Sequence, residues 1–320
     1  MRVGFVVDAT CDLPDECLER FGVRILPNVL ELGSRTWIDE RDPEQTMMLY
    51  RRFISDRSVE ARVNAASTAE IRDIFLQELV LDYDRVLVIS AAAEFSDMHA
   101  HATEASYAIL QEYRERRDEA ERAGSFALRV LDSRSFGAGE GVVLCRALQL
   151  LDEAGRGFDK IRLILRDELD RVRCLFVPGD PWYLRRRGMD GAGGGIGRSD
   201  YLLASVAGLK PVVELARGRR SLVARPRGFD AACAHAMDEA RRAIARGLGT
   251  PTLVLSFGGD PRVIRQMDAY QELEAAAIGA HLDLHLAVMS AGAGARLGPG
   301  AFSLAWLEAP QGSARAPGSR

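Results

Sequence analysis

The sequence predicts an α/β protein of two lobes, with a mainly parallel sheet in the N-terminal lobe and a mixed sheet in the C-terminal lobe. Apolar runs typical of buried strands alternate with amphipathic helical patterns along most of the 320 residues, which is the usual sign of βα units. After about residue 155 a hairpin pattern joins the alternation. We therefore place the N-terminal lobe at residues 1–155, the C-terminal lobe at 156–309, and a ligand cleft between them. Residues 310–320, rich in Ser, Ala, Gly, Arg and Pro, are expected to form a disordered tail.

The first strand of the N-terminal lobe is the apolar run at 3–7. A short helix follows, with Pro14 in its first turn and Gly22 beyond its end. Capping-box patterns at Asp42 and Ser67 open two further helices. The remaining predicted elements are strands at 24–30, 85–90 and 127–133, and helices at 97–118 and 138–154.

The C-terminal lobe has a series of helices and strands interrupted by a flexible segment and a hairpin. The segment at 185–200 is rich in Gly and Arg and is expected to be flexible. Two strand-like runs flank Gly218, which favours a hairpin turn there. The other predicted elements are helices at 157–171, 229–246 and 260–276, and strands at 173–178, 252–257, 282–289 and 301–307.

The composition, with 47% hydrophobic and 28% charged residues, is that of an ordinary globular protein. A net charge of −4 gives no reason to expect nucleic acid or an anionic membrane as a partner. The five cysteines form no C-x-x-C pair, so we expect reduced thiols rather than a disulfide framework or a zinc site. The N-terminus enters a strand at once and no apolar run reaches 18 residues, which predicts a cytoplasmic protein without membrane insertion.

No motif indicates catalysis, a metal site or a cofactor. The glycine-rich stretch at 191–197 lacks the G-x-G-x-x-G spacing and the Walker lysine of phosphate-binding loops. His281 and His285 lie four residues apart without a third metal ligand. We find no cysteine beside a plausible histidine base.

Four loops stand out, because each follows a predicted strand at its carboxyl end. They lie at 8–14, 62–68, 90–97 and 132–140. Open α/β sheets bind their ligands at that edge. The arrangement favours a small-molecule site, and it does not require the site to do chemistry.

These loops resemble those of the DegV family, whose members bind fatty acids and present them to a separate fatty acid kinase subunit. VVDATCDLP at 6–14 is similar to the family's D-S-T-x-D-L-P, and VLDSRSFGAGEG at 130–141 to its D-S loop and long helix. AGLKPVVEL and LVARPRG resemble its (I/L)-K-P hairpin and K-x-R motif, and LGPGA resembles a late landmark. The resemblance extends over residues 3–306. It implies a two-domain α/β fold, a fatty acid held between the domains, and no enzyme activity of its own.

The chain departs from the family at the positions that hold the fatty acid carboxylate. The family's hydroxyl-bearing residues fall on Ala93 and Val63, and the histidine before its terminal G-P-G is Arg296. A carboxylate taken from water without hydrogen-bond partners is costly, so other groups must hold it. The candidate binding residues are the anion partners Arg227 and Arg296, the donors Asn64, Ser67 and Ser96, the loop supports Thr10 and Ser133, and Ala93 at the altered position.

We therefore expect non-enzymatic binding of a long-chain fatty acid or related acyl lipid in an interlobe tunnel, without a cofactor. The resemblance adds a fatty acid kinase subunit as a partner. Three outcomes stay open for the altered carboxylate-binding positions: the arginines hold the carboxylate, the site takes a neutral lipid, or binding is lost. The alternatives are a small-molecule enzyme that uses Asp8, Cys11 or His99 in the cleft, and a scaffold or regulatory protein without lipid.

Overall fold

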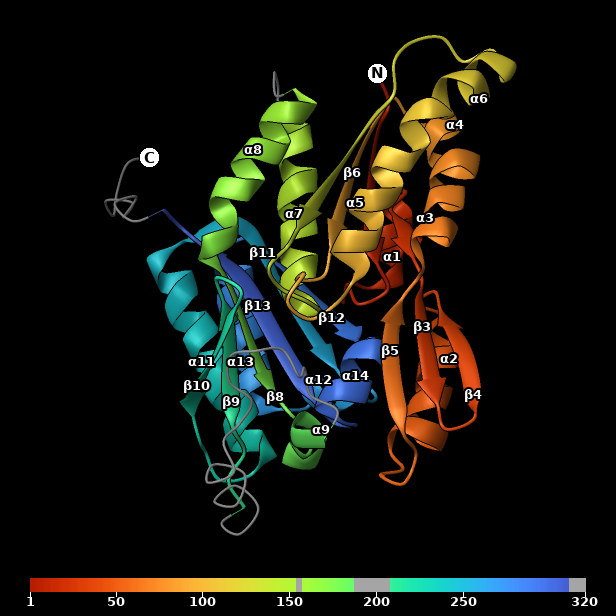
Figure 1. Cartoon of the computed structure of the whole chain (residues 1–320). Helices are drawn as coiled ribbons and strands as arrows, with labels where there is room; N and C mark the ends of the chain where they lie inside the picture. The colour runs from red at the N-terminus through yellow and green to blue at the C-terminus, as the bar shows by residue number, and fades with distance from the viewer. Residues whose placement is uncertain (154–156, 187–207, 311–320) are drawn as a thin grey trace, which may run out of the picture.

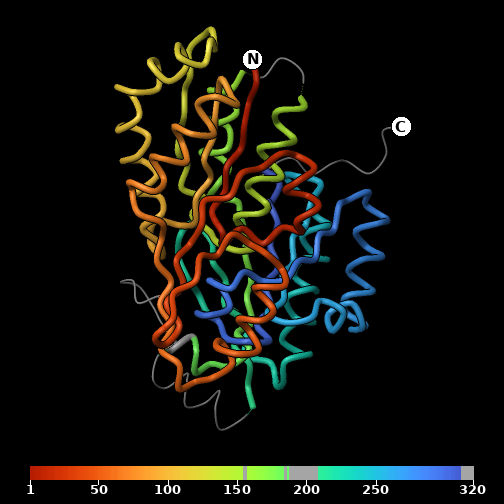
Figure 2. The backbone as a smooth tube through the Cα atoms, turned by 90° about the vertical axis from the view of Figure 1, so that its right-hand side faces the viewer, coloured from red at the N-terminus to blue at the C-terminus, as the bar shows by residue number. Residues whose placement is uncertain are grey.

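The computed structural model describes residues 1–153, 157–186 and 208–310. Most of its elements form five layers (Figure 1): outer helices, the N-terminal sheet, a shared helical layer, the C-terminal sheet and a second set of outer helices. In the view turned by 90° (Figure 2), the two sets of outer helices lie on opposite sides of the molecule. The predicted tail from residue 311 onward, most of the predicted flexible segment and the glycine-rich stretch at 191–197 lie outside the described residues.

The N-terminal sheet, which the sequence predicted to be mainly parallel, is parallel throughout. Its strands, in order across the sheet, are β2 (Arg24–Leu26), β1 (Val3–Asp8), β6 (Arg85–Ser90) and β7 (Ala127–Asp132). Its central strands are apolar on both faces, because both faces are covered by helices. The outer helices are α3 (Thr68–Ile74), η2 (Phe75–Leu79), α4 (Val80–Asp82), α5 (Met98–Ala108), η3 (Ile109–Gln111) and α6 (Tyr113–Glu119), the last three dividing the predicted helix at 97–118.

The C-terminal sheet is mixed, which confirms the second part of the fold prediction. Its strands, in order, are β10 (Arg219–Ala224), β9 (Val212–Ala216), β8 (Val172–Val177), β13 (Phe302–Glu308), β11 (Leu248–Phe257) and β12 (Asp283–Val288). Only the β11–β12 pair is parallel among these described strands. The helices on its outer side are α11 (Phe229–Arg246), α12 (Arg262–Arg265) and α13 (Asp268–Gly279).

A third, antiparallel sheet was not predicted. It consists of β4 (Arg35–Asp39), β3 (Asn28–Leu32) and β5 (Ala61–Ala65), with α2 (Pro43–Leu49) and η1 (Tyr50–Ile54) between β4 and β5. The single strand predicted at 24–30 is divided at Pro27, so β2 joins the N-terminal sheet and β3 begins the third sheet. Proline carries no N–H for a ladder hydrogen bond, which makes it a natural place for this division.

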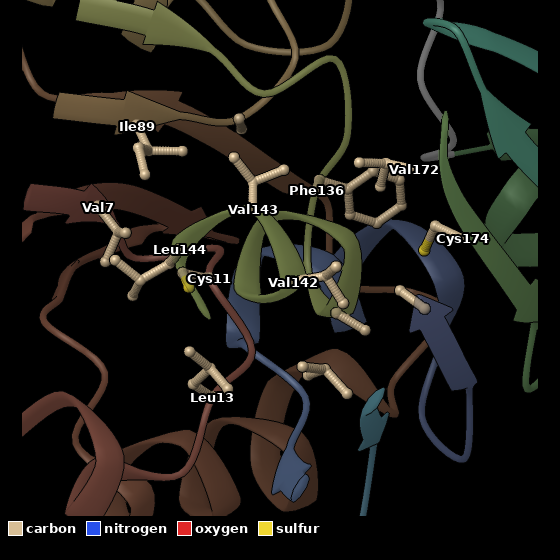
Figure 3. Close-up of a cluster of buried hydrophobic side chains, with 14 of the residues drawn as sticks. Val7, Cys11, Leu13, Ile89, Phe136, Val142, Val143, Leu144, Val172 and Cys174 are labelled. Carbon is tan, nitrogen blue, oxygen red and sulfur yellow. The ribbon is translucent and has the colours of Figure 1, made fainter. Parts of the chain in front are cut away.

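The shared helical layer consists of α7 (Ala138–Asp152) and α8 (Phe158–Glu168), and α1 (Asp15–Arg20) lies beside it. Figure 3 shows Val142, Val143 and Leu144 of α7 among side chains from both sheets. Those neighbours include Val7, Ile89, Val172 and Cys174. Each fully buried side chain of this size contributes roughly 1.5–3 kcal/mol. One hydrophobic core therefore joins the two halves of the chain. The remaining elements are η4 (Leu169–Arg171), α9 (Pro181–Arg186) and α14 (Ala291–Leu297).

Candidate functional site

A pocket of about 810 Å³ lies between β5, the loop after β6 and the C-terminal end of α14. We call residues 91–97 the pocket loop. Trp182 and Arg186 of α9 complete the lining. Small-molecule sites typically enclose roughly 300–1,000 Å³, so the pocket has the size of a ligand site. It takes residues from both halves of the chain, as the predicted interlobe cleft requires.

The pocket is apolar along one wall and charged at its rim. Val59, Ala61 and Val63 are partly buried and pack against the hydrophobic cluster of the third sheet. The rim carries exposed charged side chains of both signs, which are Arg57, Glu60, Arg62, Glu94, Asp97 and Arg186. Such a site can hold an apolar chain along β5 and a polar group at one end.

Arg296 is the cation at the inner end of this pocket. It lies in the last turn of α14, a helix that Ser290 caps by accepting a hydrogen bond from Ala293 N at 3.2 Å. Its Nη1 donates to Phe95 O at 2.8 Å and its Nη2 to Val63 O at 3.5 Å. Within the described residues it forms no ion pair with a carboxylate. Arginine has five N–H donors, so this guanidinium retains donors for a ligand.

Burial lowers the pKa of Arg296, and the charges of Asp8 and Asp97 act in the opposite direction. An arginine begins from so high a pKa that it remains a cation. A partly buried guanidinium that is bonded to neutral carbonyls gains more from an anionic partner than a fully exposed one does. The site therefore favours an anionic group, such as a carboxylate, beside Arg296.

The pocket loop is held by groups from two neighbouring loops. Ala91 N donates to Asp8 Oδ2 at 2.6 Å, and Ala92 N donates to Ser135 O at 2.7 Å. Ala93 N donates to Asp132 Oδ1 at 3.3 Å. These contacts come from the ends of β1 and β7, so the small side chains of the loop sit on a fixed backbone.

Four of the predicted binding residues line the pocket: Asn64, Ala93, Ser96 and Arg296. Asn64 Nδ2 donates to Glu31 Oε1 at 3.0 Å, so one of its donors is engaged across the third sheet. Ser96 Oγ accepts from Met98 N at 3.2 Å, which leaves its hydroxyl proton for another acceptor.

The other four predicted residues lie outside the pocket lining. Ser67 caps α3 in the predicted capping box, and Ser133 Oγ donates to Ser135 O at 3.0 Å inside a buried turn. Thr10 is buried at the end of β1. Arg227 is exposed on the segment after β10. The structure thus places Ser67, Thr10 and Ser133 as supports of helices and loops.

A buried pair of carboxyl groups was not predicted. Thr10 Oγ1 lies 2.5 Å from Asp8 Oδ1 and 3.0 Å from Glu140 Oε2. Asp8 N donates to Glu140 Oε1 at 3.3 Å, and Thr10 N donates to Asp8 Oδ1 at 2.9 Å. Burial raises the pKa of Asp8, and burial together with the charge of Asp8 raises the pKa of Glu140 well above its usual value. The sequence signal is the single acid between two glycines at the start of an apolar helix.

A second buried network joins β1 to the C-terminal half through Arg41. Its Nη1 lies 3.2 Å from Asp12 Oδ1, and its Nη2 donates to Val288 O at 3.3 Å. Asp12 also accepts from Ser256 Oγ at 2.5 Å and from Ser290 N at 2.8 Å. Burial raises the pKa of Asp12, whereas the charge of Arg41 and the hydrogen bonds from Ser256 and Ser290 act in the opposite direction. The aspartates of the first loop therefore support the structure around the pocket.

One expectation from the sequence was wrong, because a cysteine does lie beside a histidine. Cys17 Sγ of α1 and His285 Nδ1 of β12 are 3.5 Å apart. Burial raises the pKa of the Cys17 thiol and lowers that of His285. Both shifts favour the neutral forms, so this contact is a neutral hydrogen bond rather than an ion pair. The two residues are 268 positions apart in the chain, and no local motif signals their contact.

Two side chains of the enzyme alternative, Cys11 and His99, are buried or contact other side chains in the structure. Cys11 is fully buried, and burial raises the pKa of its thiol well above the usual value, which disfavours the nucleophilic thiolate. His99 Nδ1 lies 3.3 Å from Ser90 Oγ, at the end of β6. No three metal-binding side chains come together in residues 1–153, 157–186 and 208–310. No helix in these ranges has the length and apolarity needed to cross a membrane.

The sequence is similar to known proteins over nearly its whole length. A family model described as an uncharacterised protein of the DegV family matches residues 2–309. A DegV domain-containing protein of Xanthomonas campestris is 33% identical over 310 residues, which are 97% of this chain and 98% of that protein. A fatty acid-binding protein of Thermotoga maritima is 31% identical over 107 residues, which are 33% of this chain and 37% of that protein.

The fold is similar to solved structures of proteins that bind fatty acids. A stearic acid-binding protein from Eubacterium ventriosum has a TM-score of 0.76 at 18% identity, with 96% of this chain and 98% of that chain covered. DegV of Bacillus subtilis, described as a fatty acid binding protein, has a TM-score of 0.71 at 17% identity, with 97% and 100% covered. At these identities the likeness establishes the shared fold.

Proposed function

Because this chain belongs to the DegV family, we propose that it is a non-enzymatic protein that binds a long-chain fatty acid or related acyl lipid beside Arg296. The lipid carboxylate meets the guanidinium, and the acyl chain lies along the apolar side of β5. The proposal has two further parts. The cysteines, which are free in the described residues, favour a protein that works in the cytoplasm, and the resemblance adds a fatty acid kinase subunit that uses the bound lipid.

The state of Arg296 is the observation that carries this proposal. Its guanidinium faces the pocket, keeps two carbonyl partners and lacks a carboxylate partner in the described residues. The positions of the family's hydroxyls carry Val63 and Ala93, which offer no side-chain hydrogen bond. Val63 nevertheless contributes its carbonyl to fix the guanidinium. A charge-assisted bond from an arginine is stronger than one from a neutral hydroxyl, so one residue can replace the missing pair.

The acyl chain supplies most of the expected affinity. Each methylene removed from water contributes about 0.8 kcal/mol. The pocket wall offers Val59, Ala61 and the buried ring of Phe95. The carboxylate end then fixes the orientation of the chain rather than its total binding energy.

Native mass spectrometry of the purified full-length protein, with organic extraction of bound molecules, tests the proposal. We expect a stoichiometric fatty acid. After delipidation, Arg296→Ala is expected to weaken fatty acid binding by about 10- to 150-fold, because a hydrogen bond to a charged group contributes roughly 1.5–3 kcal/mol. Arg62→Ala is the matched control, because Arg62 lines the same pocket but is exposed and paired with Glu60 at 2.8 Å.

The outcomes separate the alternatives. Equal losses in the two arginine variants would show that the pocket attracts anions only through its general charge. A bound neutral lipid would overturn the role of Arg296. A protein that carries nothing and takes up no added fatty acid would reject lipid binding and leave the scaffold alternative.

A further inference from the structure

Glu140 is fully buried in the first turn of α7 and contacts the carboxyl of Asp8 through Thr10. We propose that Glu140 is a neutral carboxylic acid, whose proton completes a hydrogen-bonded chain from α7 to the pocket loop and thereby positions that loop. The part of this proposal that concerns ligand affinity rests on the proposed function. The part that concerns the proton does not.

The count of hydrogen atoms requires the extra proton. Thr10 Oγ1 lies within hydrogen-bond distance of both Asp8 Oδ1 and Glu140 Oε2. A threonine hydroxyl has one hydrogen, so it can donate to only one of the two carboxyl groups. If both carboxylates were ionised, the other contact would place a lone pair against a negative oxygen. A proton on Glu140 removes this conflict.

The remaining hydrogen bonds assign that proton to Glu140 rather than to Asp8. Asp8 already accepts from Thr10 N at 2.9 Å and from Ala91 N at 2.6 Å, and these backbone donors stabilise its charge. Glu140 receives one backbone N–H, from Asp8, at 3.3 Å. The chain therefore runs from Glu140 Oε2–H to Thr10 Oγ1, from the threonine hydroxyl to Asp8 Oδ1, and from Ala91 N to Asp8 Oδ2.

The charges around Glu140 agree with this assignment. Neither Glu140 nor Asp8 forms an ion pair in the described part of the chain. The charges of Asp8 and Asp12 both oppose ionisation of Glu140. Arg41 is engaged with Asp12, and the nearby Cys11 thiol is neutral. A second negative charge here would be buried without a cation, which proteins avoid by binding a proton instead.

The hydrogen-bonded chain from Glu140 ends on the pocket loop. The position of the loop therefore depends on every hydrogen bond in that chain being formed. Asp8 holds Ala91 N, and Ala93 and Phe95 follow within the same loop. Phe95 O in turn holds Arg296 at 2.8 Å. Glu140 is thus a positioning residue, which acts on the ligand site through Thr10, Asp8 and the loop.

Infrared spectroscopy tests the proton without any ligand. We expect the C=O stretch of a protonated carboxylic acid in the native protein at neutral pH, and its loss in Glu140→Gln. Labelling glutamate with ¹³C at the carboxyl group must shift the same band in the unmutated protein, which keeps the test valid if the variant does not fold. A native protein without this band, or a band that the label leaves in place, would overturn the proposal.

Two variants then separate hydrogen bonding from packing. Gln can donate to Thr10 and accept from Asp8 N, whereas Leu fills similar space and does neither. Glu140→Gln is expected to keep slow amide exchange at Ala91 and unchanged fatty acid affinity. Glu140→Leu is expected to speed exchange there and to weaken fatty acid binding by about tenfold, since a lost hydrogen bond costs about 1 kcal/mol or more. Equal behaviour of the two variants would overturn the positioning role. If the native protein binds no fatty acid, the infrared band and the amide exchange still decide the proposal.

Discussion

Replacing Glu140 with glutamine is expected to change how the stability of the protein depends on pH. In the folded protein, burial and the neighbouring Asp8 charge raise the pKa of Glu140 well above its usual value. In the unfolded chain, the same glutamate ionises with a pKa of about 4.3. Between these two pKa values the folded state holds one more proton than the unfolded state. Stability therefore falls as pH rises through this window, and the Glu140→Gln substitution removes that dependence.

The magnitude follows from the number of protons alone. One proton difference changes the free energy of unfolding by about 1.4 kcal/mol per pH unit at 25 °C. The native protein is expected to lose about this amount relative to the glutamine variant for each pH unit that lies between the two pKa values. Domains are typically stable by about 5–15 kcal/mol, so the effect is a large fraction of the total.

Urea denaturation of both proteins at pH 5, 6, 7 and 8 measures this difference. The ionisable groups that act on Glu140 are Asp8 and Asp12, with Cys11 close by and Arg41 paired with Asp12. All four are present in both proteins, so their own contributions largely cancel. We expect the two stability curves to diverge as pH rises, with the variant the more stable at pH 8. Parallel curves would refute the reasoning, because they would show that Glu140 ionises in the folded protein much as it does in the unfolded chain.

Three further substitutions test other features of the structure. Arg117→Ala leaves three backbone carbonyls and the carboxylate of Asp84 without their buried donor, and is expected to cost about 3–5 kcal/mol in urea denaturation; a loss below about 1 kcal/mol, typical of a surface pair, would contradict the buried network. Gly294→Ala places a Cβ 1.9 Å from the Tyr50 hydroxyl, so we expect a loss of about 1–3 kcal/mol and a lower Tm. Ala93→Ser adds a donor to the pocket wall and is expected to tighten fatty acid binding about tenfold; unchanged affinity would show that the carboxylate does not reach this wall.

Local sequence patterns correctly predicted the helix caps and the order of strands and helices, because these features depend on residues close together in the sequence. The capping box at Ser67 is present as expected, and Asp42 caps α2 by accepting from Gln45 N at 2.6 Å. The alternation of strands and helices correctly indicated a parallel sheet followed by a mixed one. The division at Pro27 was missed, although the proline itself signals a break in strand pairing. No local pattern reports that the two parts pair with different sheets.

The site was predicted where the resemblance supplied the alignment and missed where contacts are non-local. The family pattern pointed to Arg296 and Ala93, and both line the pocket. Glu140 was overlooked, because an acid in the first turn of a helix usually interacts with the helix dipole at the surface. Its burial depends on Asp8, which lies 132 residues earlier in the chain. No pattern of neighbouring residues reports that contact.

The position of β13 in the C-terminal sheet bears on how the chain folds during synthesis. This strand lies between β8 and β11 and pairs antiparallel with both, although it is the last strand of the described chain. Until β13 has left the ribosome, β8 and β11 each have an unpaired strand edge. The side of α7 that faces this sheet then also lacks the side chains of β13 that pack against it. Open strand edges are templates for aggregation. A chain stopped at residue 300 is therefore expected to aggregate rather than to settle as a smaller folded protein.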